Sequence, residues 1–287
     1  MAQLAQPLVL DTDLGTDVDD VLALALLLGS PELRLDGITT VYGDVLHRAK
    51  MASRVAAIAG RSVGPIVPGL GTPRSGREVY WPGHEGALLD DLHREQVSAS
   101  YDAARVLAAA GTVLAIGPLT NVAAALERDD CVPKQLVLMG GEFVDGKVEH
   151  NIRCDVDSAV VVFGSGQPVT IIGLDQTRRL RFGLPLAEQL AAAGGLGELL
   201  AAEMRQYWDF RGESHNVPHD PAAALMLVEP DLFVFQTGHI TVVPGGPDAG
   251  LTGFKPDPDG PHRIVTDLDP LRVTRALITR ITAACTV

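Results

Sequence analysis

The chain has 287 residues, of which 46% are hydrophobic and only 5% aromatic, and its formal net charge is −13 at pH 7. This length and composition suit a large aliphatic core, and we expect residues 1–287 to form a single domain. The negative charge argues against nonspecific binding to nucleic acid or to anionic membrane surfaces, but it permits a small neutral or cationic ligand.

Strand-like and helix-like segments alternate along the chain. Expected strands with their following loops lie at 8–11, 33–44, 64–69, the start of 112–128, 135–141 and 168–177. Expected helices lie at 18–30, 46–60, the end of 112–128, 157–166, 197–214, within 215–230, and at 272–284, whereas 244–262 is expected to be a surface loop rich in Gly, Pro and Asp. This alternation predicts an α/β fold with an open, mostly parallel, doubly wound sheet flanked by helices.

Polar loops follow several of these expected strands. In open α/β sheets, ligands bind beyond the carboxyl ends of the strands. The loops at 11–20, 42–47, 117–121 and 139–151 each follow an expected strand. We therefore expect them to converge on one edge of the sheet and to form the functional site there.

The cysteines and the hydropathy pattern indicate the compartment. There are three cysteines, an odd number, and no CxxC spacing, so a disulfide framework is not expected and a reducing cytoplasm is the default. The first residues lack the basic start and apolar stretch of a signal peptide, and no uncharged apolar run approaches the roughly 20 residues of a membrane span. We expect a cytoplasmic protein with no membrane partner.

Residues 9–24, VLDTDLGTDVDDVLAL, carry an unusual concentration of acid. Five aspartates fall within ten positions: Asp11, Asp13, Asp17, Asp19 and Asp20. We expect Gly15 to permit a tight turn and Asp17 to be the N-cap of a helix starting at Val18. Each aspartate raises the pKa of its neighbours, and a helix dipole stabilises an acid by less than about 1 kcal/mol at most surface sites. The dipole alone therefore cannot neutralise the cluster.

A bound divalent cation or a solvated group of helix-capping acids would explain this cluster. Ca²⁺ takes about 6–8 oxygen ligands in irregular geometry, and Mg²⁺ prefers a strict octahedron with more water. Zn²⁺ usually requires His or Cys, which the stretch lacks. The pattern DxDxGxDxDD directly follows a buried strand, and this position favours a metal ion over a solvated surface cluster.

DTDLGTDVDD at 11–20 resembles the N-terminal signature of the inosine–uridine type nucleoside hydrolases. Further segments resemble the family in the same order: ITTVYGD (38–44), AIGPLTNVAAAL (115–126), LVLMGG (136–141), EHNIRCDVDSA (149–159), LDQT (174–177) and HDPAAAL (219–225). The resemblance implies an open α/β fold and a Ca²⁺-dependent N-ribohydrolase that converts ribonucleosides to free base and ribose. It also implies a homodimer or homotetramer.

The resemblance also implies roles for particular residues. The implied metal ligands are Asp13, Asp19, Asp20, Asp220 and the backbone carbonyl of Thr120. Asp13 would also deprotonate the attacking water, and His219 would protonate the leaving base, as general acid–base catalysis requires. The implied ribose contacts are Asp44, Met139, Glu149 and Asn151.

Some positions depart from the family pattern or allow a structural explanation. Asp44 stands where many members have Asn, and no counterpart is found of the Asn that often precedes the Glu-x-Asn segment. His84, in WPGHEG at 81–86, could reach the substrate from a mobile loop or lie in a surface turn. Tyr207 and Trp208 could stack on the base or pack in the core.

Two other functions remain open from the residues alone. A haloacid-dehalogenase-like, Mg²⁺-dependent phosphohydrolase also begins with a strand and Asp-x-Asp, with Asp11 as nucleophile and Asp13 as acid/base, although its Asp-Asp pair comes much later in the chain. A non-catalytic nucleoside-binding protein would keep the metal and ribose contacts without turnover. Release of ribose from inosine or uridine, with p-nitrophenyl phosphate left intact, would distinguish the hydrolase from both.

Overall fold

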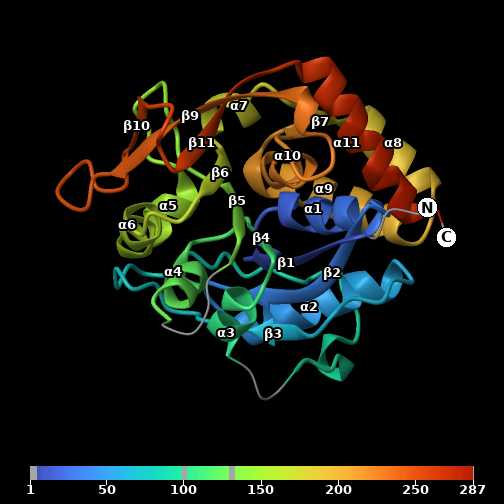
Figure 1. Ribbon diagram of the computed structural model, residues 1–287. Coiled ribbons are helices and arrows are strands. Elements are labelled where there is room, and N and C mark those ends of the chain that lie inside the picture. The colour runs from blue at the N-terminus through green and yellow to red at the C-terminus, as the bar shows by residue number, and fades with distance from the viewer. Residues whose placement is uncertain (1–4, 99–101, 129–132, 287) are drawn as a thin grey trace.

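The computed structural model describes residues 5–98, 102–128 and 133–286 (Figure 1). Its main sheet has nine strands in the order β10-β9-β11-β6-β5-β4-β1-β2-β3. The strands are β1 (Gln6–Thr12), β2 (Leu33–Thr40), β3 (Ile66–Pro68), β4 (Thr112–Ala115), β5 (Gln135–Met139), β6 (Val169–Ile172), β9 (Phe233–Val242), β10 (Thr252–Pro256) and β11 (His262–Leu268). A small second sheet pairs β7 (Phe182–Gly183) with β8 (His215–Asn216).

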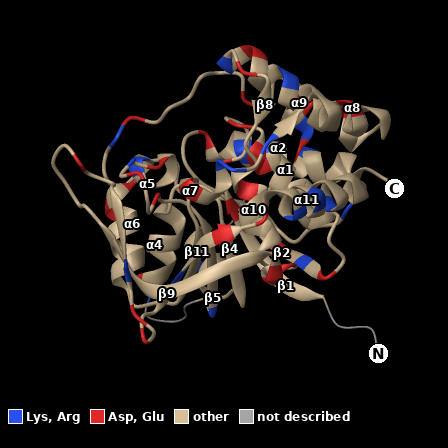
Figure 2. Ribbon diagram, turned by 90° about the horizontal axis from the view of Figure 1, so that it is seen from above, with Lys and Arg blue, Asp and Glu red and all other residues tan. Residues whose placement is uncertain are grey.

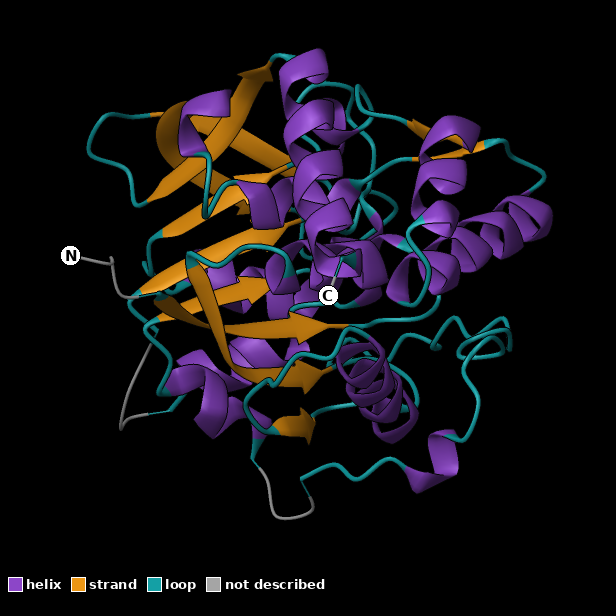
Figure 3. Ribbon diagram, turned by 90° about the vertical axis from the view of Figure 1, so that its right-hand side faces the viewer, coloured by secondary structure: helices purple, strands orange, loops and turns teal. Residues whose placement is uncertain are grey.

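The expected mostly parallel sheet is confirmed. All neighbouring pairs from β11 through β6, β5, β4, β1 and β2 to β3 are parallel, whereas β9 runs antiparallel to β10 and β11. In Figure 3 the arrows of the parallel strands point to the same side of the molecule. The loops after these strands therefore meet at one edge of the sheet, where ligands bind in such folds.

Helices cover both faces of the sheet. They are α1 (Asp19–Leu28), α2 (Val45–Ile58), α3 (Ala103–Ala108), α4 (Thr120–Leu126), α5 (His150–Cys154), α6 (Val156–Gly164), α7 (Leu174–Thr177), α8 (Leu184–Ala192), α9 (Leu196–Arg211), α10 (His219–Leu225) and α11 (Pro270–Cys285). One apolar cluster joins α1, α2, α8, α9, α10 and α11 to the sheet, and a second joins α3, α4 and α6 to the opposite face. Each face thus has its own core layer.

Helix α1 is buried almost along its whole length. Its sequence DDVLALALLL is apolar on every side after the first two residues, which is typical of a helix enclosed within a core. It packs against α10 and α11. Its N-terminal end therefore brings Asp19 and Asp20 into the protein interior, at the edge of the sheet.

Three local expectations are wrong. Segment 168–177 is not one strand, because β6 ends at Ile172 and α7 begins after Gly173. Segment 244–262 is not all loop, because β10 adds to the sheet edge beside β9. Val18, not Asp17, is the N-cap of α1, and the Asp17 carboxylate instead accepts a hydrogen bond from the Val18 N–H at 2.6 Å.

Among the described residues, Cys154 and Cys285 are free and buried, whereas Cys131 lies outside them. No described helix combines the length and the apolar character needed to cross a membrane.

Candidate active site

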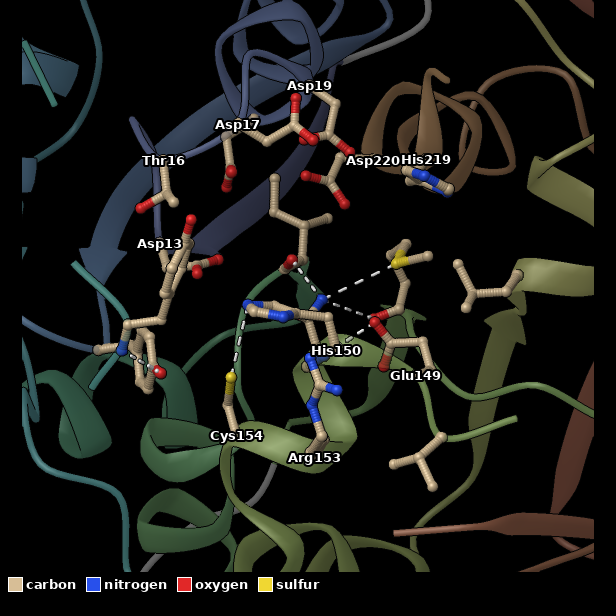
Figure 4. Close-up of a pocket in the computed structure, with 18 of the residues that line it drawn as sticks. Asp13, Thr16, Asp17, Asp19, Glu149, His150, Arg153, Cys154, His219 and Asp220 are labelled. Atoms are coloured by element: carbon tan, nitrogen blue, oxygen red, sulfur yellow. Dashed lines mark hydrogen bonds between the residues drawn. The ribbon is translucent and has the colours of Figure 1, made fainter. Parts of the chain in front are cut away.

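A cavity of about 860 Å³ opens at the carboxyl ends of the central strands. Ten of the residues singled out in the sequence line it: Asp13, Asp17, Asp19, Asp20, Met139, Glu149, Asn151, Tyr207, His219 and Asp220. Figure 4 shows Asp17, Asp19, Asp220 and His219 on one side of this cavity, with Glu149, His150 and Arg153 across from them. The expected loops at 11–20, 42–47 and 139–151 therefore supply part of its walls, whereas 117–121 contributes no lining residue.

Three carboxylates lie close enough together to hold one metal ion. Carboxylate oxygens of Asp19, Asp20 and Asp220 all lie within 4.8 Å of one another, and all three residues are buried. Asp19 and Asp20 begin α1, and Asp220 is the second residue of α10. Because α1 and α10 pack side by side, their N-terminal ends meet at the acidic region in the centre of Figure 2.

The electrostatics of this cluster favour a cation. Burial, followed by mutual repulsion of the carboxylates, raises the pKa values of Asp19 and Asp220 well above the usual range, and burial with repulsion from Asp13 does the same for the pKa of Asp20. One oxygen of Asp220, Oδ1, is buried without a hydrogen-bond partner among the described residues. An all-carboxylate donor set with a free oxygen fits a hard divalent cation.

These pKa shifts predict how the metal-free protein responds to pH. A raised pKa means that the folded protein binds protons more tightly than the unfolded chain, so proton binding stabilises the fold. This contribution is fully present below the ordinary aspartate pKa of 3.8 and is lost as the pH rises through the raised pKa values. Without metal, wild type should therefore lose stability relative to Asp220→Asn as the pH rises above 3.8. Saturating calcium should reverse the order, because the cation stabilises only the intact cluster.

Melting temperatures of both proteins in chelator and in calcium, at each pH, test this expectation. A metal-free wild type that keeps its advantage over Asp220→Asn at the higher pH would contradict it.

Asp13 lies in the loop after β1, beside a buried arginine. Burial raises the pKa of Asp13, and the positive charge of Arg48 opposes that rise. The Arg48 guanidinium donates hydrogen bonds to the backbone carbonyls of Asp13, Leu14 (2.8 Å) and Tyr42 (2.7 Å). These hydrogen bonds from Arg48, a residue of α2, thus fix the conformation of the acidic loop.

Glu149 and Asn151 have fixed positions on the opposite wall. Glu149 is the N-cap of α5 and accepts hydrogen bonds from the N–H groups of Gly141 (3.2 Å), Asn151 (2.8 Å) and Ile152 (3.0 Å). The Asn151 amide donates to the carbonyl of Ile116 at 2.8 Å. Because these hydrogen bonds fix the orientation of both side chains, they can form well-directed hydrogen bonds with a polar ligand in the cavity.

His219 begins α10 and is joined to α7. Its Nδ1 lies 2.7 Å from Thr177 Oγ1. Burial, assisted by the nearby Arg178 charge, lowers the pKa of His219 to about 4. At neutral pH its ring is therefore uncharged in the metal-free protein.

Three predicted site residues do not line the cavity. Asp44 caps α2 by accepting from the His47 N–H at 2.9 Å, and Thr120 Oγ1 donates to Asp155 at 2.6 Å. The His84 ring bonds the Thr16 carbonyl at 2.9 Å and lies 4.6 Å from the Phe210 ring, so it fixes the loop at 81–86 against α9. Their roles towards metal or substrate stay predictions.

Several cavity residues were not assigned a role from the sequence. Arg77, Arg153, Arg178 and Arg211 line the cavity of this acidic protein. Of the two aromatic residues considered in the sequence, Tyr207 lines the cavity beside Asp17, whereas Trp208 packs in the apolar core. The sequence signal that could have found Arg48 is its position in the apolar stripe of α2. Arg48, Met51, Ala52 and Val55 recur at helical spacing, and all are buried.

Asp11 occupies a different environment from the metal-binding acids. It lies in β1, is fully buried, does not line the cavity, and accepts hydrogen bonds from Thr39 Oγ1 (2.6 Å) and Asn121 Nδ2 (2.8 Å). Burial raises its pKa to about 7. A nucleophilic Asp11, as the phosphohydrolase alternative requires, would have no access to substrate.

A buried carboxylate cluster at the carboxyl edge of a doubly wound sheet, facing oriented polar groups across a cavity, is the arrangement of a metal-dependent hydrolase. The description of the matching family is "inosine-uridine preferring nucleoside hydrolase", and its model matches residues 8–275. The chain belongs to this family and is a nucleoside N-ribohydrolase. The comparisons support neither the phosphohydrolase nor the non-catalytic alternative.

Relatives and solved structures agree with this assignment. Uridine nucleosidase 1 of Arabidopsis thaliana is 31% identical, over 86% of this chain and 81% of its own. The non-specific ribonucleoside hydrolase RihC of Klebsiella pneumoniae is 32% identical, over 82% and 83%. The structure of a purine-preferring ribonucleoside hydrolase from Gardnerella vaginalis superposes with a TM-score of 0.84 at 26% identity, covering 98% of this chain and 99% of the other.

Proposed function

We propose that the protein hydrolyses purine and pyrimidine ribonucleosides with calcium bound by Asp13, Asp19, Asp20, Asp220 and the Thr120 carbonyl. The observation that carries this proposal is the buried cluster of Asp19, Asp20 and Asp220, whose oxygens lie within 4.8 Å of one another. Bound there, calcium would lower the pKa of a coordinated water and hold the ribose 2′- and 3′-hydroxyls.

The chain's own residues supply the remaining steps. Asp13 removes a proton from the attacking water, which adds directly to C1′ as in an inverting glycosidase. Glu149, Asn151 and Met139 contact the ribose, and the polar pair discriminates against sugars that lack the matching hydroxyls, because its buried groups would then stay unpaired. His219 assists the departing base from the opposite side of the ribose, and Asp44 and His84 are further substrate contacts.

A substrate panel tests this function. Inosine, adenosine, guanosine, uridine and cytidine are incubated with the enzyme, and released reducing sugar is measured before and after chelation. We expect hydrolysis of purine and pyrimidine nucleosides, a loss of at least about 10²-fold in chelator, and recovery with added calcium, since the metal contributes several kcal/mol. Release of phosphate from p-nitrophenyl phosphate, or activity that survives chelation, would contradict the proposal.

The proposal extends to organisation. Residues 1–287 act as one nucleoside hydrolase-like domain, assembled as a homodimer or homotetramer in the cytoplasm. Size-exclusion chromatography with light scattering measures the assembly.

A further inference from the structure

Arg178 occupies an unusual position in the cavity wall. It is the C-cap residue of α7, and it lines the cavity together with His219. The preceding residue, Thr177, is joined to His219 by the 2.7 Å contact between Oγ1 and Nδ1. The backbone that carries Arg178 is therefore held directly beside the start of α10.

The adjacent arginine shows a different arrangement. Arg179 donates hydrogen bonds to Gln176 Oε1 at 2.6 Å, to Asp267 Oδ1 at 2.7 Å and to the Leu268 carbonyl at 2.8 Å, so its guanidinium is held against the fold. Arg178 has no such hydrogen bond or ion pair with any residue that the structure describes. Its donors are thus available to a ligand in the cavity.

The same cavity also offers surface that suits a planar base. Arg178 lies close enough to His219 for its charge to act on that ring, and Leu174, Tyr207 and Phe210 line the cavity from α7 and α9. The carboxylate cluster and the wall formed by Glu149 and Asn151 are polar and suit the ribose. A nucleoside with its sugar against the acids then directs its base toward α7 and α9.

We propose that Arg178 is a catalytic residue for departure of the base, to which its guanidinium donates hydrogen bonds as negative charge develops there. This inference rests on the proposed function. The water oxygen bonds to C1′ while the C1′–N bond breaks, and the electron pair of that bond stays with the base. The water proton goes to Asp13, and the released base takes its proton from solvent by way of the His219 ring. Arg178 remains protonated throughout, because a guanidinium does not give up its proton in proteins.

The nature of the leaving group provides the test. The bases of uridine and inosine are poor leaving groups. The p-nitrophenolate released from p-nitrophenyl β-D-ribofuranoside is a stable anion and leaves without hydrogen bonds from the enzyme. In Arg178→Gln we expect kcat/KM to fall about 10²-fold for the nucleosides, the usual loss when one donor to a developing anion is removed, and less than about threefold for the nitrophenyl riboside.

Arg153→Gln is the matched control. It removes the same charge from the opposite wall of the cavity, and we expect it to change kcat/KM by the same factor for both kinds of substrate. A loss in Arg178→Gln that is equal for both kinds, or no loss for either, would overturn the proposal, since a merely structural arginine would not distinguish leaving groups.

A binding measurement separates this inference from the proposed function. A wild-type enzyme that hydrolyses none of these substrates would refute the proposed function, and the affinity for p-nitrophenolate would then decide the role of Arg178. We expect Arg178→Gln to bind this anion at least about fivefold more weakly than wild type, which is less than the tenfold or greater change that about 1.5–3 kcal/mol for a hydrogen bond to a charged group would give. Equal affinities would overturn the inference.

Discussion

Replacing Asp13 by Asn lowers kcat for nucleoside hydrolysis by about 10²- to 10⁴-fold, the range that a general base contributes. Asparagine keeps the size of the side chain but cannot accept the water proton. Asp13 lines the cavity beside the carboxylate cluster, and its charge acts on the pKa of Asp20. Steady-state kinetics at saturating calcium measure the loss, which corresponds to about 3–5.5 kcal/mol of transition-state stabilisation.

Calcium binding distinguishes the two roles proposed for Asp13. Titration calorimetry should show a smaller effect of Asp13→Asn on the dissociation constant than of Asp220→Ala, because Asp220 belongs to the closest three-carboxylate group. Asp145→Asn, an exposed aspartate paired with Lys147, is the matched control and should leave kcat within about twofold. Wild-type turnover in Asp13→Asn would exclude this residue as the base.

The parallel part of the fold could be predicted because its strands are buried on both faces. Such strands read as continuous aliphatic runs, and β1, β4, β5 and β6 all do. The antiparallel strands β9 and β10 could not be recognised in this way. Their residues are mostly exposed or half-buried, and β10 lies in a Gly- and Pro-rich segment that resembles a loop.

The candidate site could be predicted only where its residues are neighbours in sequence. Asp19 and Asp20 are adjacent, and their crowding was itself the signal. Asp220 joins them through the packing of α1 against α10, which no local pattern specifies, and only the family resemblance indicated it. Arg48 was missed because an arginine within a helical segment is ordinarily assigned to the solvent-exposed face.

Replacing Arg48 by Met should destabilise the protein by about 3–5 kcal/mol, the cost of breaking a buried charged network. The Arg48 side chain is 0% exposed, and its guanidinium bonds Thr16 Oγ1 at 3.1 Å in addition to three backbone carbonyls. It also lies 4.7 Å from the Trp81 ring. Methionine fills much of the space but leaves those carbonyls buried without a donor, at about 1–3 kcal/mol for each unsatisfied group.

Chemical denaturation measures the loss of stability in Arg48→Met. A second variant, Arg48→Ala, separates lost packing from lost hydrogen bonding, because it leaves a cavity of guanidinium shape. In this variant about 10 mM guanidinium ion should restore part of the calcium affinity, since the ion can again bind the carbonyls of the acidic loop. Arg61→Met, an exposed change just after the same helix, should alter the free energy of unfolding by less than about 0.5 kcal/mol. Arg48→Met could instead match that control in its free energy of unfolding and keep full calcium affinity. The acidic loop would then hold its shape without the arginine, and the position of Asp13 beside the cluster would have to be attributed to the metal itself.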